Sequence, residues 1–189
     1  MHNRRLLFSL ALLAALWFGW NQLRPTFDPQ QAQLQPGGAY RLGHYTITPL
    51  APFSLEARVL GRENYRYDRG AQVSPTDLAL GWGPMADPQI LKQIDISQGN
   101  RWYRWHVDEY PIERRAIETH SANMHMIPAN AAVAAELARV RPGQNIALSG
   151  QLVRVDGDDG FHWLSSLTRE DIGDGACELV WLEKLHRLE

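Results

Sequence analysis

The sequence predicts an α+β protein in which an N-terminal transmembrane helix precedes a mostly antiparallel β barrel or sandwich with one connecting helix. Three features of the chain support this prediction. An apolar run covers residues 6–20. Short stretches of alternating apolar and polar residues recur from His44 onward, and a period of two is typical of half-buried strands. One alanine-rich segment, residues 131–140, carries the signals of a helix start and a helix stop.

The apolar run is predicted to anchor the chain in a bacterial inner membrane. Arg4 and Arg5 precede the run, and cationic residues before a span hold the N-terminus in the cytoplasm. No pair of small residues follows Trp20 at the spacing that a signal peptidase needs, which favours an uncleaved anchor over a cleaved signal peptide. The expected parts are a cytoplasmic N-terminus (1–5), a single-pass transmembrane anchor (6–23), a tether (24–43) and a periplasmic β-rich domain (44–189).

Within the outer domain, capping and turn residues mark where the elements begin and end. Asp87 followed by Pro88 predicts the start of a short helix over 87–94. Asn130 is a typical N-cap for the alanine-rich helix, and Pro142-Gly143 ends it. The glycine- and aspartate-rich residues 156–160 predict a hairpin turn. Strands or extended segments are expected at residues 45–48, 54–60, 101–108, 117–127, 145–155, 161–168 and 177–183.

Charge limits the classes of partner. Residues 25–189 retain 16 basic and 21 acidic residues, a formal net charge of −5, because residues 1–24 contain three arginines and no acidic residue. Nucleic-acid binding needs a basic field, so we expect no nucleic-acid partner. The chain has one cysteine, so no disulfide can form within it. The fold must therefore depend on packing, to which the tryptophans contribute much of the apolar bulk.

The order of strands, one helix and further strands resembles that of a five-stranded oligonucleotide/oligosaccharide-binding barrel. In this resemblance, residues 140–153 (VRPGQNIALSGQLV) correspond to the strand that is entered after the helix. The resemblance covers roughly the last 90 residues and implies a fold without implying a ligand. Residues 120–128 (HSANMHMIP), 165–169 (SSLTR) and 175–178 (GACE) are also similar to blocks in single-span bacterial envelope proteins of unknown function. That second resemblance implies a location and a fold.

The candidate binding surface lies on the strand predicted over 101–108. Tyr103 and Trp105 share the face expected to be buried, which leaves Trp102, Arg104 and His106 on the opposite face. Exposed aromatic and arginine side chains are frequent anchors of protein interfaces, and aromatic faces also stack on sugars. A face covered by a second layer of the fold is the alternative.

Catalysis would need a different set of residues. Cys177 with a base such as His162 could form a thiol nucleophile, although Cys177 opens an apolar strand and is expected to pack as a small core residue. His120 and His125 are five residues apart, which is not a chelating spacing in a strand or a helix. The turn over 156–160 departs from the calcium-loop pattern. We therefore expect no metal and no other cofactor.

These observations predict a membrane-anchored periplasmic binding or accessory module that recognises an envelope protein or a glycan. Its contact with the membrane would be the N-terminal helix. A small periplasmic hydrolase or a metal-dependent enzyme that uses Cys177 or the histidines is the alternative function. A ligand-binding sensor is disfavoured because only about five residues would remain in the cytoplasm to pass on a signal.

Overall fold

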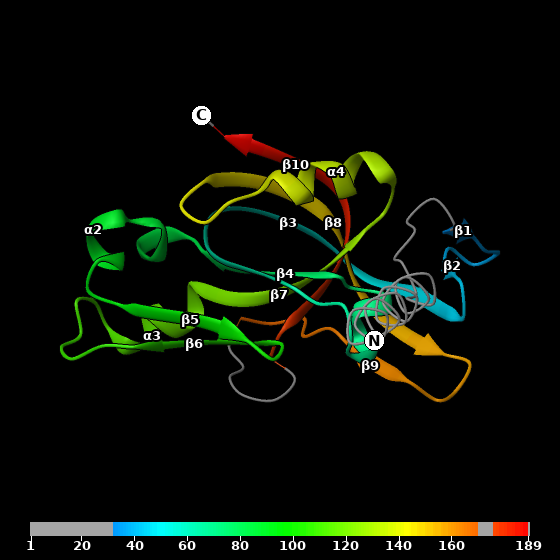
Figure 1. Ribbon diagram of the computed structural model, residues 1–189, viewed down its shortest axis with the longest axis horizontal. Helices are drawn as coiled ribbons and strands as arrows, with labels where there is room; N and C mark the ends of the chain where they lie inside the picture. Colours follow the sequence, from blue (N-terminus) through cyan, green and yellow to red (C-terminus); the bar gives the residue numbers. More distant parts are fainter. Residues whose placement is uncertain (1–31, 170–175, 189) are drawn as a thin grey trace, which may run out of the picture.

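The computed structural model describes residues 32–169 and 176–188, and most of its strands belong to one large β sheet (Figure 1). The strand order of the eight-stranded sheet is β1-β2-β3-β4-β7-β10-β8-β9, and a separate hairpin pairs β5 with β6. The strands are β1 (Gln33–Leu34), β2 (Tyr40–Leu42), β3 (Tyr45–Asn64), β4 (Thr76–Gly81), β5 (Asp95–Gly99), β6 (Trp102–His106), β7 (Ser121–Pro128), β8 (Asn145–Gly157), β9 (His162–Leu164) and β10 (Glu178–Leu188). The predicted sheet-rich fold with few helices is confirmed.

The sheet closes on itself because β3, besides its pairing with β2, pairs with both β8 and β4. Its first part runs antiparallel to β8, from Tyr45 opposite Gly157 to Arg58 opposite Asn145, and its last part runs antiparallel to β4. The closed circuit is therefore β3-β4-β7-β10-β8 and back to β3. All of these pairs are antiparallel except β7 with β10, which run parallel.

The length of β3 differs from the sequence prediction of two separate strands, 45–48 and 54–60. Pro49 and Pro52 lie within the single strand that the structure contains. A register shift against β8 between Pro49 and Ala51 accommodates the first proline, and such bulges bend a strand and increase its twist. The bend allows the first part of β3 to pair with β8 on one side and its last part to pair with β4 on the other side.

The interior of the closed sheet is filled by one apolar cluster. All five strands contribute to it, and α4 (Ala131–Arg139) adds Val133 and Leu137. The side chain of Asn130 caps this helix by accepting a hydrogen bond of 3.0 Å from the Val133 N–H, as the sequence predicted. The strand members of the cluster are Ala57, Val59, Leu78, Leu80, Ala122, Met124, Met126, Ile146, Leu148, Leu152, Val180, Leu182 and Leu185.

A second apolar cluster packs on the other face of the same sheet. On β8, Leu152 belongs to the interior cluster and its neighbour Val153 to the second, because successive strand residues point to opposite faces. Trp181 belongs to the second cluster, and the ring of Tyr40 on β2 stacks on it at 4.7 Å. The sheet thus begins within residues 24–43, which the sequence had suggested to be a tether.

Residues 82–120 form an insertion between β4 and β7. The insertion contains η3 (Gly83–Ala86), α2 (Pro88–Leu91), the β5–β6 hairpin and α3 (Arg114–Thr119), and it has a small core of its own around Met85, Ile94 and Ile117. Figure 1 shows the hairpin lying alongside β4 and β7. A further short helix, η2 (Arg69–Gln72), precedes β4.

Two sequence predictions need correction. Residues 117–127 were expected to be extended throughout, but Ile117 lies in α3, where Arg114 and Glu118 form an i,i+4 ion pair at 2.8 Å. The strand expected over 161–168 ends at Leu164. In this region Ser165 Oγ donates to the Ser166 carbonyl, and such local bonds compete with strand pairing.

The predicted transmembrane segment, residues 6–23, lies outside the described residues. Among the residues that are described, no helix has the length and apolar character needed to cross a bilayer.

Candidate functional site

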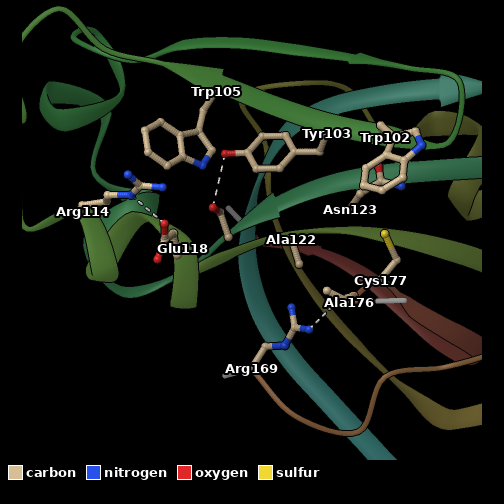
Figure 2. Close-up of a pocket in the computed structure, with 11 residues that line it drawn as sticks. Trp102, Tyr103, Trp105, Arg114, Glu118, Ala122, Asn123, Arg169, Ala176 and Cys177 are labelled. Atoms are coloured by element: carbon tan, nitrogen blue, oxygen red, sulfur yellow. Dashed lines mark hydrogen bonds and ion pairs between the residues drawn. The ribbon is translucent and has the colours of Figure 1, made fainter. Parts of the chain in front are cut away.

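A cavity of about 290 Å³ lies between the β5–β6 hairpin and the closed sheet (Figure 2). Strand β6, helix α3, the start of β7 and the residues on either side of 170–175 supply its walls. We call it the β6–β7 cavity. Its lining residues are Trp102, Tyr103, Trp105, Arg114, Glu118, Ser121, Ala122, Asn123, Arg169, Ala176 and Cys177.

Burial along β6 alternates as the sequence predicted. Tyr103 and Trp105 are half-buried, whereas Trp102, Arg104 and His106 are exposed. The three predicted binding residues share the exposed face of β6, and of the three only Trp102 also lines the cavity. His106 lies near the end of the hairpin, with its Nε2 at 3.6 Å from Asp108 Oδ1.

The floor of the cavity is polar, but its side chains bond to one another. Tyr103 donates a hydrogen bond of 3.2 Å to Ser121 Oγ, which itself donates to the Ile117 carbonyl at 2.7 Å. Burial raises the pKa of Tyr103 to about 12, so the phenol is a neutral donor in the physiological range. Asn123 donates to the Arg101 carbonyl at 3.1 Å and accepts a bond of 2.8 Å from the Gln98 side chain.

A buried ionic cluster continues from this floor across the outer face of β4 and β7. Asp77 on β4 has no exposed surface, and its Oδ1 accepts a bond of 2.7 Å from Arg101 Nη1. Asn123 Nδ2 donates to Asp77 Oδ2 at 3.2 Å, and His125 Nδ1 lies 2.9 Å from that oxygen. The His125 ring also contacts Trp163, with centroids 4.5 Å apart.

The sequence did not indicate this cluster. The local signal was a charged residue, Asp77, directly before the apolar residues 78–80 of β4. Its partner Arg101 is 24 residues away and reaches it through a turn in which Asn100 and Arg101 both have positive φ, 55° and 67°. Because positive φ is uncommon for residues other than glycine, the pattern of residue types did not reveal that turn.

Cys177 occupies a different position from the core site that its apolar neighbours suggested. It is half-buried and precedes β10, which begins at Glu178. Cys177 lines the same cavity as Trp102 and Asn123 (Figure 2). The adjacent Glu178 carboxylate is buried and forms an ion pair with Arg169.

His162, the base proposed for a Cys177 nucleophile, lies elsewhere. It is on β9, where its Nδ1 is 2.8 Å from Asp156 Oδ1, and it does not line the β6–β7 cavity. The structure therefore does not bring Cys177 and His162 into one cavity. Within residues 32–169 and 176–188, no three His, Cys, Asp or Glu side chains are grouped so that they could hold a metal ion.

The fold and the site define a closed β barrel with an inserted hairpin and an aromatic cavity between the two. A scan of the chain against protein-family models gives no match, and a search of curated proteins finds no similar protein.

Proposed function

We propose that the protein is a membrane-anchored periplasmic binding or accessory module, and that it recognises an envelope protein or a glycan in the β6–β7 cavity. The main support is the β6–β7 cavity, which combines two tryptophans and two arginines at the junction of the barrel and its insertion. A concave site with aromatic walls and a few polar groups is the usual form of a binding site.

The strand order supports a barrel of the oligonucleotide/oligosaccharide-binding type. If β3, β4, β7, β8 and β10 are its strands one to five, the circuit is 1-2-3-5-4-1, and α4 lies between the third and fourth strands. Barrels of this type bind ligands on the face of their second and third strands. The β6–β7 cavity includes residues of the third strand and of the connection between the fourth and fifth.

The anchor and the location rest on the sequence. The apolar run over 6–20, with arginines before it, supports a single-pass signal anchor in the inner membrane with the C-terminal domain in the periplasm. The similarity of residues 120–128 to a block in bacterial envelope proteins supports the same compartment. The formal charge of −5 over residues 25–189 argues against nucleic acid as the ligand.

The alternative of a small periplasmic hydrolase draws support from Cys177, which lines the cavity. A thiol nucleophile also needs a base or a cationic group to form the thiolate. No histidine is among the residues that line the cavity, and His162 is paired with Asp156 on β9. The binding function therefore has the stronger support.

Site-specific crosslinking in intact cells tests the proposal. A photoreactive phenylalanine derivative at position 102 keeps an aromatic group on the cavity wall, whereas the same derivative at position 104 lies on the same strand outside the cavity. We expect a discrete adduct to an envelope protein or glycan from position 102 and little from position 104. Absence of any adduct from position 102, together with turnover of an envelope substrate by the purified chain, would contradict the proposal.

A further inference from the structure

We propose that Arg62 on β3 and Arg141, in the loop between α4 and β8, form a second binding site that takes a phosphate group. The group belongs either to a lipid headgroup or to a soluble phosphorylated compound, and both sources share the chemistry that the two arginines recognise. Neither arginine lines the β6–β7 cavity, so this site is separate from that of the proposed function and does not depend on it.

A β-bulge turns Arg62 toward the inner face of the barrel. Before the bulge, Val59 lies opposite Leu80, and both belong to the interior cluster. The register shifts between Val59 and Gly61, so that Arg62 then lies opposite Leu78, which also belongs to that cluster. Residues directly opposite each other in an antiparallel pair share one face of the sheet. Without the extra residue Gly61 would take the inward position, and bulges that redirect a side chain are frequent beside functional sites.

The Arg62 side chain lacks an acceptor in this position. The residue is half-buried, and its Nε is buried without a hydrogen-bond partner among the described residues. The neighbouring Glu63 lies opposite Asp77 and therefore belongs to the other face of the sheet. A donor that has left water without gaining an acceptor is costly, most of all when it carries a charge. The position therefore indicates a ligand that supplies the missing acceptor.

The loop that carries Arg141 is fixed to β3 beside the bulge. Val59 N–H donates to the Gln144 carbonyl at 2.8 Å, and Gly143 N–H donates to the Val59 carbonyl at 2.7 Å. The Arg141 N–H in turn donates to Gln144 Oε1 at 2.8 Å, which closes the loop on itself. These bonds hold Arg141 near the part of β3 in which Arg62 turns inward.

Arg141 brings a second positive charge to Arg62. Its Nη1 donates to the carbonyls of Ala138 and Val140 at 2.8 and 2.9 Å, which fixes the guanidinium at the C-terminal end of α4. Burial and the charge of Arg141 both lower the pKa of Arg62 from its ordinary value, and no carboxylate among the described residues offsets them. Both guanidiniums still carry their charge at physiological pH, because arginine titrates far above it.

The charge of the pair indicates the ligand. A phosphate monoester carries a charge of about −1.5 to −2 near neutral pH and presents three acceptor oxygens, so one such group matches both guanidiniums. The planar fork of arginine binds these oxygens through parallel hydrogen bonds. A single carboxylate would neutralise only one of the two arginines. Residues 25–189 have a formal net charge of −5, so the attraction comes from this pair rather than from a general basic field.

NMR of the arginine side chains tests the site directly. The full-length chain, with its arginines labelled with heavy nitrogen, is titrated with inorganic phosphate in micelles of an uncharged detergent. The Nε–H signal of Arg62, assigned by its loss in Arg62→Gln, should shift and saturate. Arg141→Gln should weaken binding at least about tenfold, because it removes charge-assisted hydrogen bonds. Arg139→Gln is the matched control, since Arg139 already pairs with Glu136 on α4 and should not affect phosphate binding.

Thermal unfolding checks that the variants differ in binding rather than in folding. Arg62→Gln removes a half-buried charge that has no partner among the described residues, so without phosphate its melting temperature should equal or exceed that of the wild type. Phosphate should raise the melting temperature of the wild type but not that of Arg62→Gln, because a ligand that binds only the folded state stabilises it.

Nanodiscs separate the two sources of the phosphate group. If discs that contain phosphatidic acid shift the Arg62 signal and discs of phosphatidylcholine alone do not, the group is that of a lipid headgroup. If free phosphate alone shifts the signal, the ligand is a soluble compound. The proposal is overturned if neither phosphate nor phosphatidic acid shifts the signal, if acetate binds as tightly as phosphate, or if Arg139→Gln weakens binding as much as Arg141→Gln does.

Discussion

Arg101 Nη1 lies 2.7 Å from Oδ1 of Asp77, a carboxylate with no exposed surface. Asp77 belongs to the barrel strand β4, whereas Arg101 belongs to the turn of the inserted hairpin. The bond therefore ties the insertion to the barrel. It also holds β6 over the start of β7, and so it contributes to the width of the cavity between them.

Replacing Arg101 should destabilise the domain strongly. Arg101→Leu leaves the buried Asp77 carboxylate without its arginine, and loss of one partner from a buried ion pair costs about 3–5 kcal/mol. Urea unfolding followed by circular dichroism measures the loss. Arg104→Leu on the same hairpin is the control, because Arg104 is exposed and should change stability by no more than about 0.5 kcal/mol. Equal stability of the two variants would show that the bond contributes little.

Closure of the barrel depends on close backbone contact at Gly150. A Cβ atom at this position would lie 1.9 Å from the Trp181 carbonyl oxygen on β10. Gly150→Ala should therefore separate β8 from β10 and lower the melting temperature by several degrees, corresponding to about 2 kcal/mol or more. Gly99→Ala is the control, since a Cβ there meets nothing within 4 Å. An unchanged melting temperature for Gly150→Ala would contradict the β8–β10 pairing.

The aspartates of the β8–β9 turn should make the domain sensitive to acid. Hydrogen bonds from Arg41 hold the pKa of Asp158 below its ordinary value, and a bond from Arg69 does the same for the pKa of Asp159. A carboxylate with a lowered pKa in the folded state stabilises the fold above its unfolded pKa of about 3.9, and this stability is lost as the pH falls through the folded pKa.

Arg41→Gln tests this contribution. In this variant the pKa of Asp158 should rise toward the ordinary value. The free energy of unfolding of the variant should therefore fall less than that of the wild type as the pH drops below about 4. Carbon NMR titration of the Asp158 carboxyl group measures the shift. Arg139→Gln is the control, because Arg139 pairs with Glu136 on α4 and should leave Asp158 unchanged. A wild-type Asp158 that titrates at the ordinary value would rule out the mechanism.

The Cys177 thiol should react without denaturant. Its half-buried place on the cavity wall predicts slow modification by a small reagent such as methyl methanethiosulfonate in the native protein. Trp102→Ala should accelerate the reaction by opening the wall, whereas Arg104→Ala should not. Mass spectrometry of timed samples measures the rates. If the thiol is modified only after the protein unfolds, Cys177 is buried in the core, as its sequence neighbours suggested.

Local patterns in the sequence were sufficient for much of the fold. The cap at Asn130 and the stop at Gly143 predicted α4, and alternation along 101–108 predicted which side of β6 is buried. These features depend on neighbours within a few residues. The single strand β3 and the helix α3 were not predicted, because the register with β8 and the packing of Ile117 in the insertion core override the local signals.

The site was only partly predictable for the same reason. Trp102 and Cys177 were both candidates, but from separate hypotheses, and no pattern in the sequence placed them in one cavity. Their proximity arises because residues 82–120 fold back over β7. The bond of Arg101 to Asp77 that holds this arrangement depends on a turn with two positive φ angles, which no local pattern indicated.

The proposed function requires that the partner binds in the β6–β7 cavity. Isothermal titration calorimetry tests this with the partner captured from position 102, by its dissociation constant for the full-length chain, for Trp102→Ala and for Arg104→Ala. Loss of a tryptophan anchor typically weakens binding by at least about tenfold, so Trp102→Ala should lose affinity to this extent while Arg104→Ala binds like the wild type. Equal affinity of all three proteins, or a loss confined to Arg104→Ala, would contradict the claim.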